Sequence, residues 1–170
     1  MGRSIGFLAA SAAVCFAACG HPSGGAGDQA QTAQVGRRAP NWSQPTLDGR
    51  RIAMESLRGK PVYLNFFATW CHGCNEEAEA LDLVSRQYRD RGLQVVGVDV
   101  LESPRKAAEF RSQHHLSFPL VLDQGTLREQ YQINALPVQV FIDRSGTVRR
   151  IVLGQISLTE MRANVERLLQ

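Results

Sequence analysis

The sequence predicts an α/β domain in which helices cover a central mixed sheet. Two nearly continuous apolar runs, 62–67 and 93–101, have the pattern of strands that are buried on both faces. Segments with apolar residues at three- and four-residue steps alternate with these runs and predict amphipathic helices. Strands that alternate with helices, followed by a hairpin and a last helix, are typical of a layered α/β domain.

Local signals place each element along the chain. Asp48-Gly49 between short extended runs predicts an N-terminal hairpin, because this dipeptide tolerates the positive φ of a tight turn. Ser157 and Glu160 have the spacing of a capping box at the start of the last helix. In chain order, the expected elements are a hairpin over 41–52, a strand over 60–70, a helix after Cys74 that ends at Gly92, a strand over 93–101, a helix over 103–115, a strand over 118–123, a short helix over 126–132, a hairpin over 137–154 and a helix over 157–170.

The N-terminal part of the sequence predicts export. Arg3 precedes an apolar run over 5–18 that is shorter than the ~20 apolar residues of a transmembrane helix, as in a secretory signal peptide. The stretch FAACG over 16–20 resembles the cleavage site of bacterial lipoproteins, in which the cysteine, here Cys19, carries the lipid. An ordinary cleaved signal peptide is the alternative. We therefore expect a lipoprotein signal peptide over 1–18, a flexible tether over 19–36 and one folded domain over 37–170.

Composition narrows the classes of function. The 170 residues carry a formal net charge of +3 without a dense basic stripe, which argues against nucleic-acid binding. His114 and His115 end a predicted helix, where cations interact favourably with the helix C-terminus, and no further metal ligands accompany them. We expect a monomer with no bound metal and no cofactor.

The stretch TWCHGCNEE over 69–77 carries the chemistry. A lone CxxC pair supplies too few ligands for a tetrahedral zinc site. Haem attachment requires C-x-x-C-H, but Asn75 follows Cys74. A structural disulfide between Cys71 and Cys74 would close a very short loop, and such a bridge stabilises little. Redox chemistry fits best, while a metal site and a structural bridge remain open.

The position of Cys71 favours redox chemistry, because it lies between a buried strand and the start of a helix. Free amide N–H groups and the helix dipole stabilise a thiolate there, and the thiolate is the form that attacks disulfides. Cys74, one turn later, can resolve the resulting mixed disulfide. His72, when protonated, would add positive charge beside the thiolate, and a solvated loop histidine is the alternative.

The segment NFFATWCHGCNEE over 65–77 resembles the active site of thioredoxin-fold proteins. It is most similar to the TlpA/ResA-like thiol–disulfide oxidoreductases, membrane-anchored proteins of the thioredoxin superfamily and of AhpC/TSA-redoxin type. The similarity also includes VGRRAPNW over 35–42, SLRGKPVYLNFFATWC over 56–71 and ALPVQVFIDRSG over 135–146. The resemblance implies a thioredoxin-like fold with an N-terminal β-hairpin extension and a redox disulfide between Cys71 and Cys74.

By position, the resemblance implies that Cys71 is the nucleophile and Cys74 the resolving thiol. Pro137 is implied to be a cis-proline that packs against the disulfide and offers backbone atoms to an extended substrate. Glu77 matches a carboxylate of ResA-like proteins, and we assign it the handling of protons. The buried aspartate that thioredoxins use for this purpose is replaced here by Asn65.

Further positions would shape the site. Trp70 flanks the exposed sulfur, and Glu102 matches a second acidic position near the site in some relatives, with a surface charge as the alternative. Gly73 stands where most relatives have proline, so we expect a less rigid helix start and a changed reduction potential. Leu136 makes the rim beside Pro137 more apolar than in most relatives, which predicts a different substrate segment.

Together these features predict a periplasmic or extracytoplasmic, lipid-anchored thiol–disulfide oxidoreductase. We expect it to reduce specific protein disulfides, as in cytochrome c maturation or copper-site assembly. Its expected partners are protein disulfides or dithiols and a membrane electron donor or acceptor. A disulfide-donating oxidase is the nearest alternative, because the direction of electron transfer depends on how stable the thiolate form is. A copper-binding assembly factor, which usually has a longer cysteine spacing, and a thiol peroxidase, whose proline-led motif is missing, are further alternatives.

Overall fold

A computed structural model describes residues 1–2 and 32–170 of the chain. The expected signal peptide, Cys19 and most of the expected tether lie outside the described residues. In the part of the chain that is described, no helix has both the length and the apolar character that crossing a bilayer requires.

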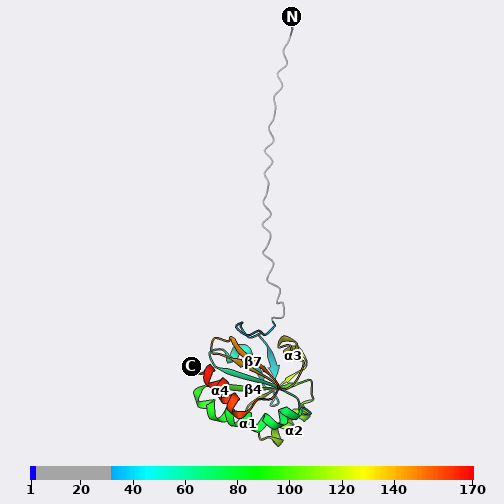
Figure 1. Cartoon of the computed structure of the whole chain (residues 1–170). Coiled ribbons are helices and arrows are strands. Elements are labelled where there is room, and N and C mark those ends of the chain that lie inside the picture. Colours follow the sequence, from blue (N-terminus) through cyan, green and yellow to red (C-terminus); the bar gives the residue numbers. More distant parts are fainter. Residues whose placement is uncertain (3–31) are drawn as a thin grey trace.

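A five-stranded mixed sheet forms the centre of the domain (Figure 1). The strands lie side by side in the order β5-β4-β3-β6-β7, with β3, β4 and β5 parallel and with β6 antiparallel to both of its neighbours. The mixed sheet predicted from the two apolar runs is therefore confirmed. The strands are β3 (Val62–Phe67), β4 (Gln94–Val100), β5 (Leu120–Asp123), β6 (Val138–Ile142) and β7 (Val148–Leu153).

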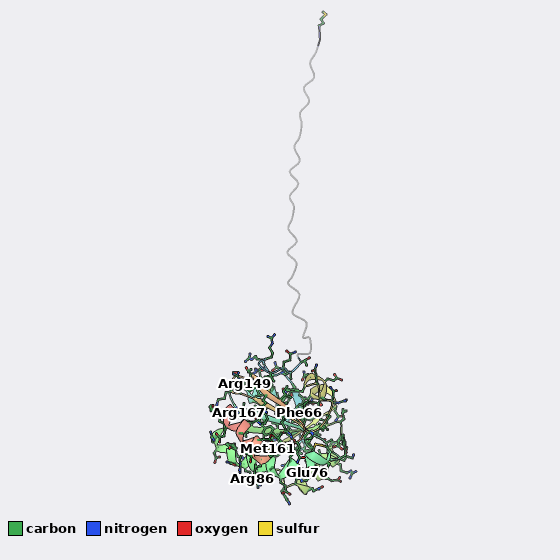
Figure 2. The ribbon with its side chains drawn as sticks, in the orientation of Figure 1. Phe66, Glu76, Arg86, Arg149, Met161 and Arg167 are labelled. Atoms are coloured by element: carbon green, nitrogen blue, oxygen red, sulfur yellow. A yellow bond between two sulfur atoms is a disulfide. The ribbon has the colours of Figure 1, made fainter. Side chains whose placement is uncertain are left out.

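Helices cover both faces of this sheet. Side chains from three helices, α1 (His72–Tyr88), α2 (Pro104–Gln113) and α4 (Leu158–Leu168), form one apolar core with the sheet. On the other face, α3 (Thr126–Gln130), the 3-10 turn η1 (Met54–Leu57) and the N-terminal segment form a second core. Figure 2 labels one member of each core, Met161 for the first and Phe66 for the second.

A small antiparallel hairpin precedes the central sheet, as the Asp48-Gly49 turn predicts. Its strands are β1 (Ser43–Pro45) and β2 (Arg51–Ala53), and Gly49 has the positive φ of 78° that the turn requires. A β-bridge between Thr46 and Val121 attaches the hairpin to the edge of the sheet at β5.

The chain enters the domain along the opposite edge strand, β7. The backbone N–H of Gly36 donates to Val148 O at 2.8 Å, and Arg38 forms a β-bridge with Thr147. Ala33, which the sequence analysis places in the tether, is buried and donates its N–H to Gln130 O at 2.8 Å. The last residues of the expected tether therefore pack against the domain.

Helix boundaries follow the predicted signals with one difference. Ser157 and Glu160 form the capping box of α4, and Gly92 ends the 3-10 turn η2 (Arg89–Arg91) that follows α1 with a φ of 92°. Helix α1 begins at His72, between the two cysteines, and not after Cys74 as the apolar pattern suggests. It begins earlier because Cys71 supplies its N-cap.

Candidate active site

The two cysteines lie where β3 ends and α1 begins. A disulfide joins Cys71 and Cys74, whose Cα atoms are 5.2 Å apart. Sγ of Cys71 also accepts a hydrogen bond from the backbone N–H of Cys74 at 3.2 Å. Cys71 is 6% exposed and Cys74 2% exposed, so Cys71 is the sulfur that a partner reaches first.

The surroundings of Cys71 favour a thiolate once the disulfide is opened. The 17 residues of α1 align their peptide dipoles toward its Sγ, and the first turn of α1 contains no acidic residue. Beside it, the Trp70 side chain is 70% exposed. The exposed ring of His72 lies 3.1 Å from Oε1 of Glu76, so this carboxylate offsets part of any charge that His72 carries.

Glu77 is buried in a polar cluster inside the domain. It lies three residues beyond Cys74, on the same face of α1, and is 2% exposed. Its Oε1 accepts hydrogen bonds from Asn65 Nδ2 and Gln139 Nε2, both at 2.7 Å, and its Oε2 accepts one from the backbone N–H of Ile156 at 3.3 Å. Burial raises the pKa of Glu77, and these hydrogen bonds offset part of that rise.

Two members of this cluster, Gln139 and Tyr63, escaped the sequence analysis as site residues. Gln139 is fully buried, and its Oε1 accepts hydrogen bonds from Asn65 Nδ2 and the Tyr63 hydroxyl, both at 2.8 Å. The sequence does hold a signal for Gln139, which is the lone glutamine inside the apolar run VQVFI. A side-chain amide in a buried strand needs hydrogen-bond partners inside the domain. Asn65 and Cys74 both line one small cavity of about 10 Å³, whose other lining residues are apolar.

Pro137 lies against the disulfide-bearing turn, and the Leu136–Pro137 peptide bond is cis, as the resemblance implies. A Cβ atom built on Gly73 would lie 3.5 Å from Pro137 Cδ and 3.3 Å from Gln155 Oε1. The absence of a side chain at Gly73 thus lets Gln155 lean over the helix start. Gln155 is a rim residue that the sequence analysis missed, because it is distant from the CxxC motif along the chain.

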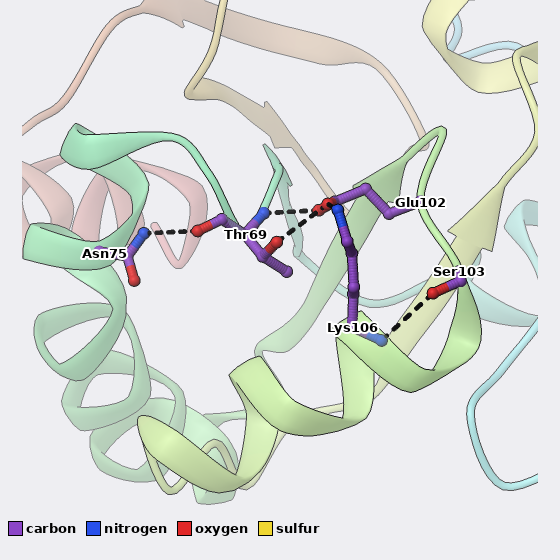
Figure 3. A network of polar contacts seen from close by, with 5 residues as sticks. All are labelled: Thr69, Asn75, Glu102, Ser103 and Lys106. Atoms are coloured by element: carbon purple, nitrogen blue, oxygen red, sulfur yellow. Dashed lines mark hydrogen bonds and ion pairs between the residues drawn. The ribbon is translucent and has the colours of Figure 1, made fainter.

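Glu102 holds the loop that precedes Cys71 (Figure 3). Its carboxylate accepts hydrogen bonds from the backbone N–H of Thr69 at 2.6 Å and from the Thr69 hydroxyl at 2.9 Å, and it pairs with Lys106 at 3.3 Å. Burial acts to raise the pKa of Glu102, but the bonds from Thr69 and the charge of Lys106 lower it below its usual range. With a side chain only 3% exposed, Glu102 is not a solvated surface charge.

Asn75 holds the same loop from the other side. Its Nδ2 donates to the carbonyl oxygens of Thr69 at 3.0 Å and of Cys71 at 2.8 Å (Figure 3 shows the first). Its Oδ1 lies 3.0 Å from Nε2 of His114, which forms the C-cap of α2. His114 therefore lies at the end of α2, where the sequence places it. In the ranges that the structure describes, no cluster of three or more histidine, cysteine or acidic side chains could hold a metal ion.

Asp99 is a buried carboxylate near the site that the sequence analysis did not single out. It lies on β4, is 1% exposed, and neither of its oxygens has a hydrogen-bond partner among the described residues. Burial, and then the negative charge of Glu102, raise the pKa of Asp99 to about 7. The available signal was a single acidic residue inside the apolar run VVGVDVL.

The chain is similar in sequence to known proteins. A model of the AhpC/TSA family matches residues 35–151, a range that includes both cysteines, Glu77 and Pro137. Over 136 residues the chain is 29% identical to a thiol-disulfide oxidoreductase ResA of Bacillus cereus, and the match covers 79% of each chain. It is 30% identical to the thioredoxin-like protein YneN of Bacillus subtilis, over 78% of this chain and 79% of that relative.

The solved structures include similar folds. A crystal structure of a thiol:disulfide interchange protein, a thioredoxin family protein from Chlorobium tepidum, matches with a TM-score of 0.74 and 28% identity. The match covers 81% of this chain and 99% of the other. The thioredoxin-like fold expected from the sequence is therefore confirmed.

The environment of Asp99 leads to a prediction about stability and pH. Because its pKa is raised, to about 7, the native state binds a proton at this carboxyl more tightly than the unfolded chain does. The stability that this proton contributes is complete below the ordinary pKa and is lost as the pH rises through about 7. Asp99→Asn, which keeps the shape without the charge, should raise the free energy of unfolding at pH 8 by at least ~1 kcal/mol and raise it much less at pH 5.

Denaturant unfolding of both chains at the two pH values measures this difference. Asp90→Asn, at an exposed position, serves as the control and should change stability equally at both. A pH-independent effect of Asp99→Asn would contradict the prediction.

Proposed function

The chain belongs to the AhpC/TSA family and is a protein thiol–disulfide oxidoreductase, and on this premise we propose that it reduces specific disulfides of other proteins outside the cytoplasm. The observation that supports the proposal most directly is the Cys71–Cys74 disulfide at the start of α1, with Cys71 as the helix cap. The substrates would be of the kind that the resemblance implies, disulfides formed during cytochrome c maturation or copper-site assembly.

The reaction starts from the reduced pair. The Cys71 thiolate attacks one sulfur of the substrate disulfide, a mixed disulfide forms, and the first substrate thiolate leaves. The Cys74 thiolate then attacks Cys71 Sγ and releases the second substrate thiolate. The substrate gains two electrons and two protons, and the chain is left with the Cys71–Cys74 disulfide. A membrane electron donor must reduce this disulfide before the next cycle.

Glu77 is proposed to accept the proton of Cys74. Cys74 is almost fully buried, so bulk water reaches its thiol poorly. The carboxylate of Glu77 lies on the same helix face, and Asn65, which donates to this carboxylate, lines the small cavity that Cys74 also lines. Because burial raises the pKa of Glu77, its carboxylate is a better proton acceptor than an exposed glutamate.

The rim around Cys71 is proposed to bind the substrate segment. Trp70 and the partly buried Leu136 present apolar surface, and Pro137 lies against the turn that carries the disulfide. Gln155 adds an amide over Gly73. An extended segment with an apolar side chain next to its cysteine would fit this rim.

Two features favour electron donation over disulfide donation. Glu76 offsets part of the charge of a protonated His72, and the buried carboxylate of Glu77 lies on the same helix face as Cys74. Both reduce the stabilisation of thiolates at the site, and a less stable dithiol form makes a stronger reductant.

The reduction potential of the Cys71–Cys74 pair tests the direction. Titration of the purified chain against defined thiol buffers should give a value near or below that of thioredoxin, ~−270 mV. A value near that of strong oxidants, ~−120 mV, would instead make the chain a disulfide donor.

Cys74→Ser should also trap substrates as mixed disulfides on Cys71, and Cys71→Ser, the matched control, should trap none.

The proposed role of Glu77 predicts a change in the second chemical step. Glu77→Gln should slow the resolution of a mixed disulfide on Cys71 by about 100-fold, because the proton of Cys74 loses its acceptor. In the unchanged chain this rate should rise with pH through an inflection above the usual range of glutamate, and Glu77→Gln should abolish that inflection. The rate of resolution is measured by stopped-flow detection of the thiol that a model mixed disulfide releases.

Glu79→Gln is the matched control, since Glu79 lies exposed on the same helix and should leave the profile unchanged. If Glu77→Gln kept both the rate and the inflection, the proton would have another acceptor.

We further propose that a lipid on Cys19 anchors the chain to a membrane in the periplasm. Acyl chains contribute ~0.8 kcal/mol for each buried CH₂ group, so a lipid-modified cysteine would hold the domain at a membrane without a spanning helix. Cys19→Ala should move the protein from the membrane fraction to the soluble fraction or block its maturation, whereas Cys15→Ala should do neither. Mass spectrometry of the mature N-terminal peptide checks this, and an unmodified N-terminus would contradict the anchor.

A further inference from the structure

A cavity lined by arginines lies at the end of the sheet that the redox chemistry does not use. Its volume is about 590 Å³, and it opens between the β6–β7 turn and the C-terminal part of α4. Four guanidinium groups line it, whereas Asp143 is the one acidic side chain in its lining. The four are Arg144, Arg149, Arg150 and Arg167.

Most of this positive charge has no acidic partner. Arg149 pairs with Asp143 at 2.5 Å. Arg167 donates to Asn164 Oδ1 at 2.9 Å, and Arg144 donates to the carbonyl oxygen of Arg91 at 3.4 Å, but these neutral acceptors leave the charges in place. Across 32–170, neither of these two arginines forms an ion pair.

Arg150 is in the same situation. It forms no ion pair within the described ranges, although its charge contributes to lowering the pKa of Glu160. The carboxylate of Glu160 is already bound to the backbone N–H and the hydroxyl of Ser157. Three guanidinium groups therefore face one concave surface with donors free for an anionic ligand. Their planar donor sets match the oxygens of phosphate.

The cavity is at the end of the domain where the chain enters. Arg38 bridges to Thr147 in the β6–β7 turn, and Ala39 donates its N–H to Gly146 O at 2.8 Å. The disulfide lies beyond the opposite end of β3. Val62, the first residue of β3, pairs with Ile142, the last residue of β6, so the β6–β7 turn is beside the start of β3 and the disulfide is beyond its end. Figure 2 shows Arg149 and Arg167 on one side of the domain and Glu76, two residues beyond Cys74, on the other.

We propose that this arginine cavity binds the phosphate groups of anionic phospholipids and holds the domain on the membrane surface with its disulfide facing away. The part of the predicted tether that precedes Ala33 would keep the cavity within reach of lipid headgroups, since such a segment spans only about 5–6 Å × √n for n residues. Arginines near an anionic lipid surface are attracted to it individually and add together. This inference concerns the orientation of the domain and does not depend on the direction of the redox reaction.

Arginine footprinting on the full chain tests the proposal. The purified chain, produced with its own leader, is mixed with excess vesicles of phosphatidylglycerol or of phosphatidylcholine and treated with phenylglyoxal. Mass spectrometry follows the modification of each arginine. Arg144, Arg150 and Arg167 should react about fivefold more slowly on the anionic vesicles. Arg105 and Arg111, exposed on α2, are internal controls and should react equally on both.

Matched charge variants sharpen the test. In the variant Arg150→Ala/Arg167→Ala, Arg144 should lose its protection. The variant Arg105→Ala/Arg111→Ala removes the same charge from α2, and in that variant Arg144 should stay protected. Equal reaction rates on both kinds of vesicle would overturn the proposal. Protection by inorganic phosphate alone, to the same degree as by vesicles, would assign the cavity to a soluble anion and overturn the membrane assignment. The readout uses neither Cys71 nor Cys74, so its failure and a failure of the proposed redox reaction are distinguishable, whereas the reach of the tether rests on the proposed anchor at Cys19.

Discussion

The pairing of β3 with β6 is the constraint on which the active site depends. The two strands are antiparallel, so the start of β6 lies beside the end of β3, where α1 begins. Pro137, which precedes β6, therefore meets the turn that holds Cys71 and Cys74. The same register places Gln139 directly opposite Asn65, and their two side chains hold the carboxylate of Glu77 inside the domain. One strand pairing thus positions both the proposed substrate rim and the partners of the proposed proton acceptor.

Burying Glu77 has a cost that this arrangement offsets. A carboxylate removed from water destabilises the native state unless donors replace the lost solvent. Here the donors are two side-chain amides and one backbone N–H, and none of them carries a charge. With neutral donors alone, burial is the dominant influence, so the pKa of Glu77 stays raised. A cationic partner would have stabilised the charge more strongly, but it would also have made the carboxylate a poor base.

The sequence indicated those features of the site that depend on neighbours along the chain. Apolar runs located the strands, the capping box located α4, and the spacing of Cys71, Cys74 and Glu77 placed them on one face of a helix. It did not indicate Gln139 or Gln155, because their contacts come from residues far away in the sequence. A polar residue inside an apolar run signals that partners exist, but only the strand register shows which ones they are.

The two ends of the central sheet favour opposite charges. The end of β3 and the start of α1 together offer free N–H groups, which suit an exposed sulfur that must become negative. At the other end of the sheet α4 ends, and a helix C-terminus favours a cation such as Arg167 in its last turn. Arg144 lines the same cavity from the β6–β7 turn, at the end where the chain enters. A membrane attached at that end would leave the whole opposite rim, with Cys71 at its centre, open to another protein.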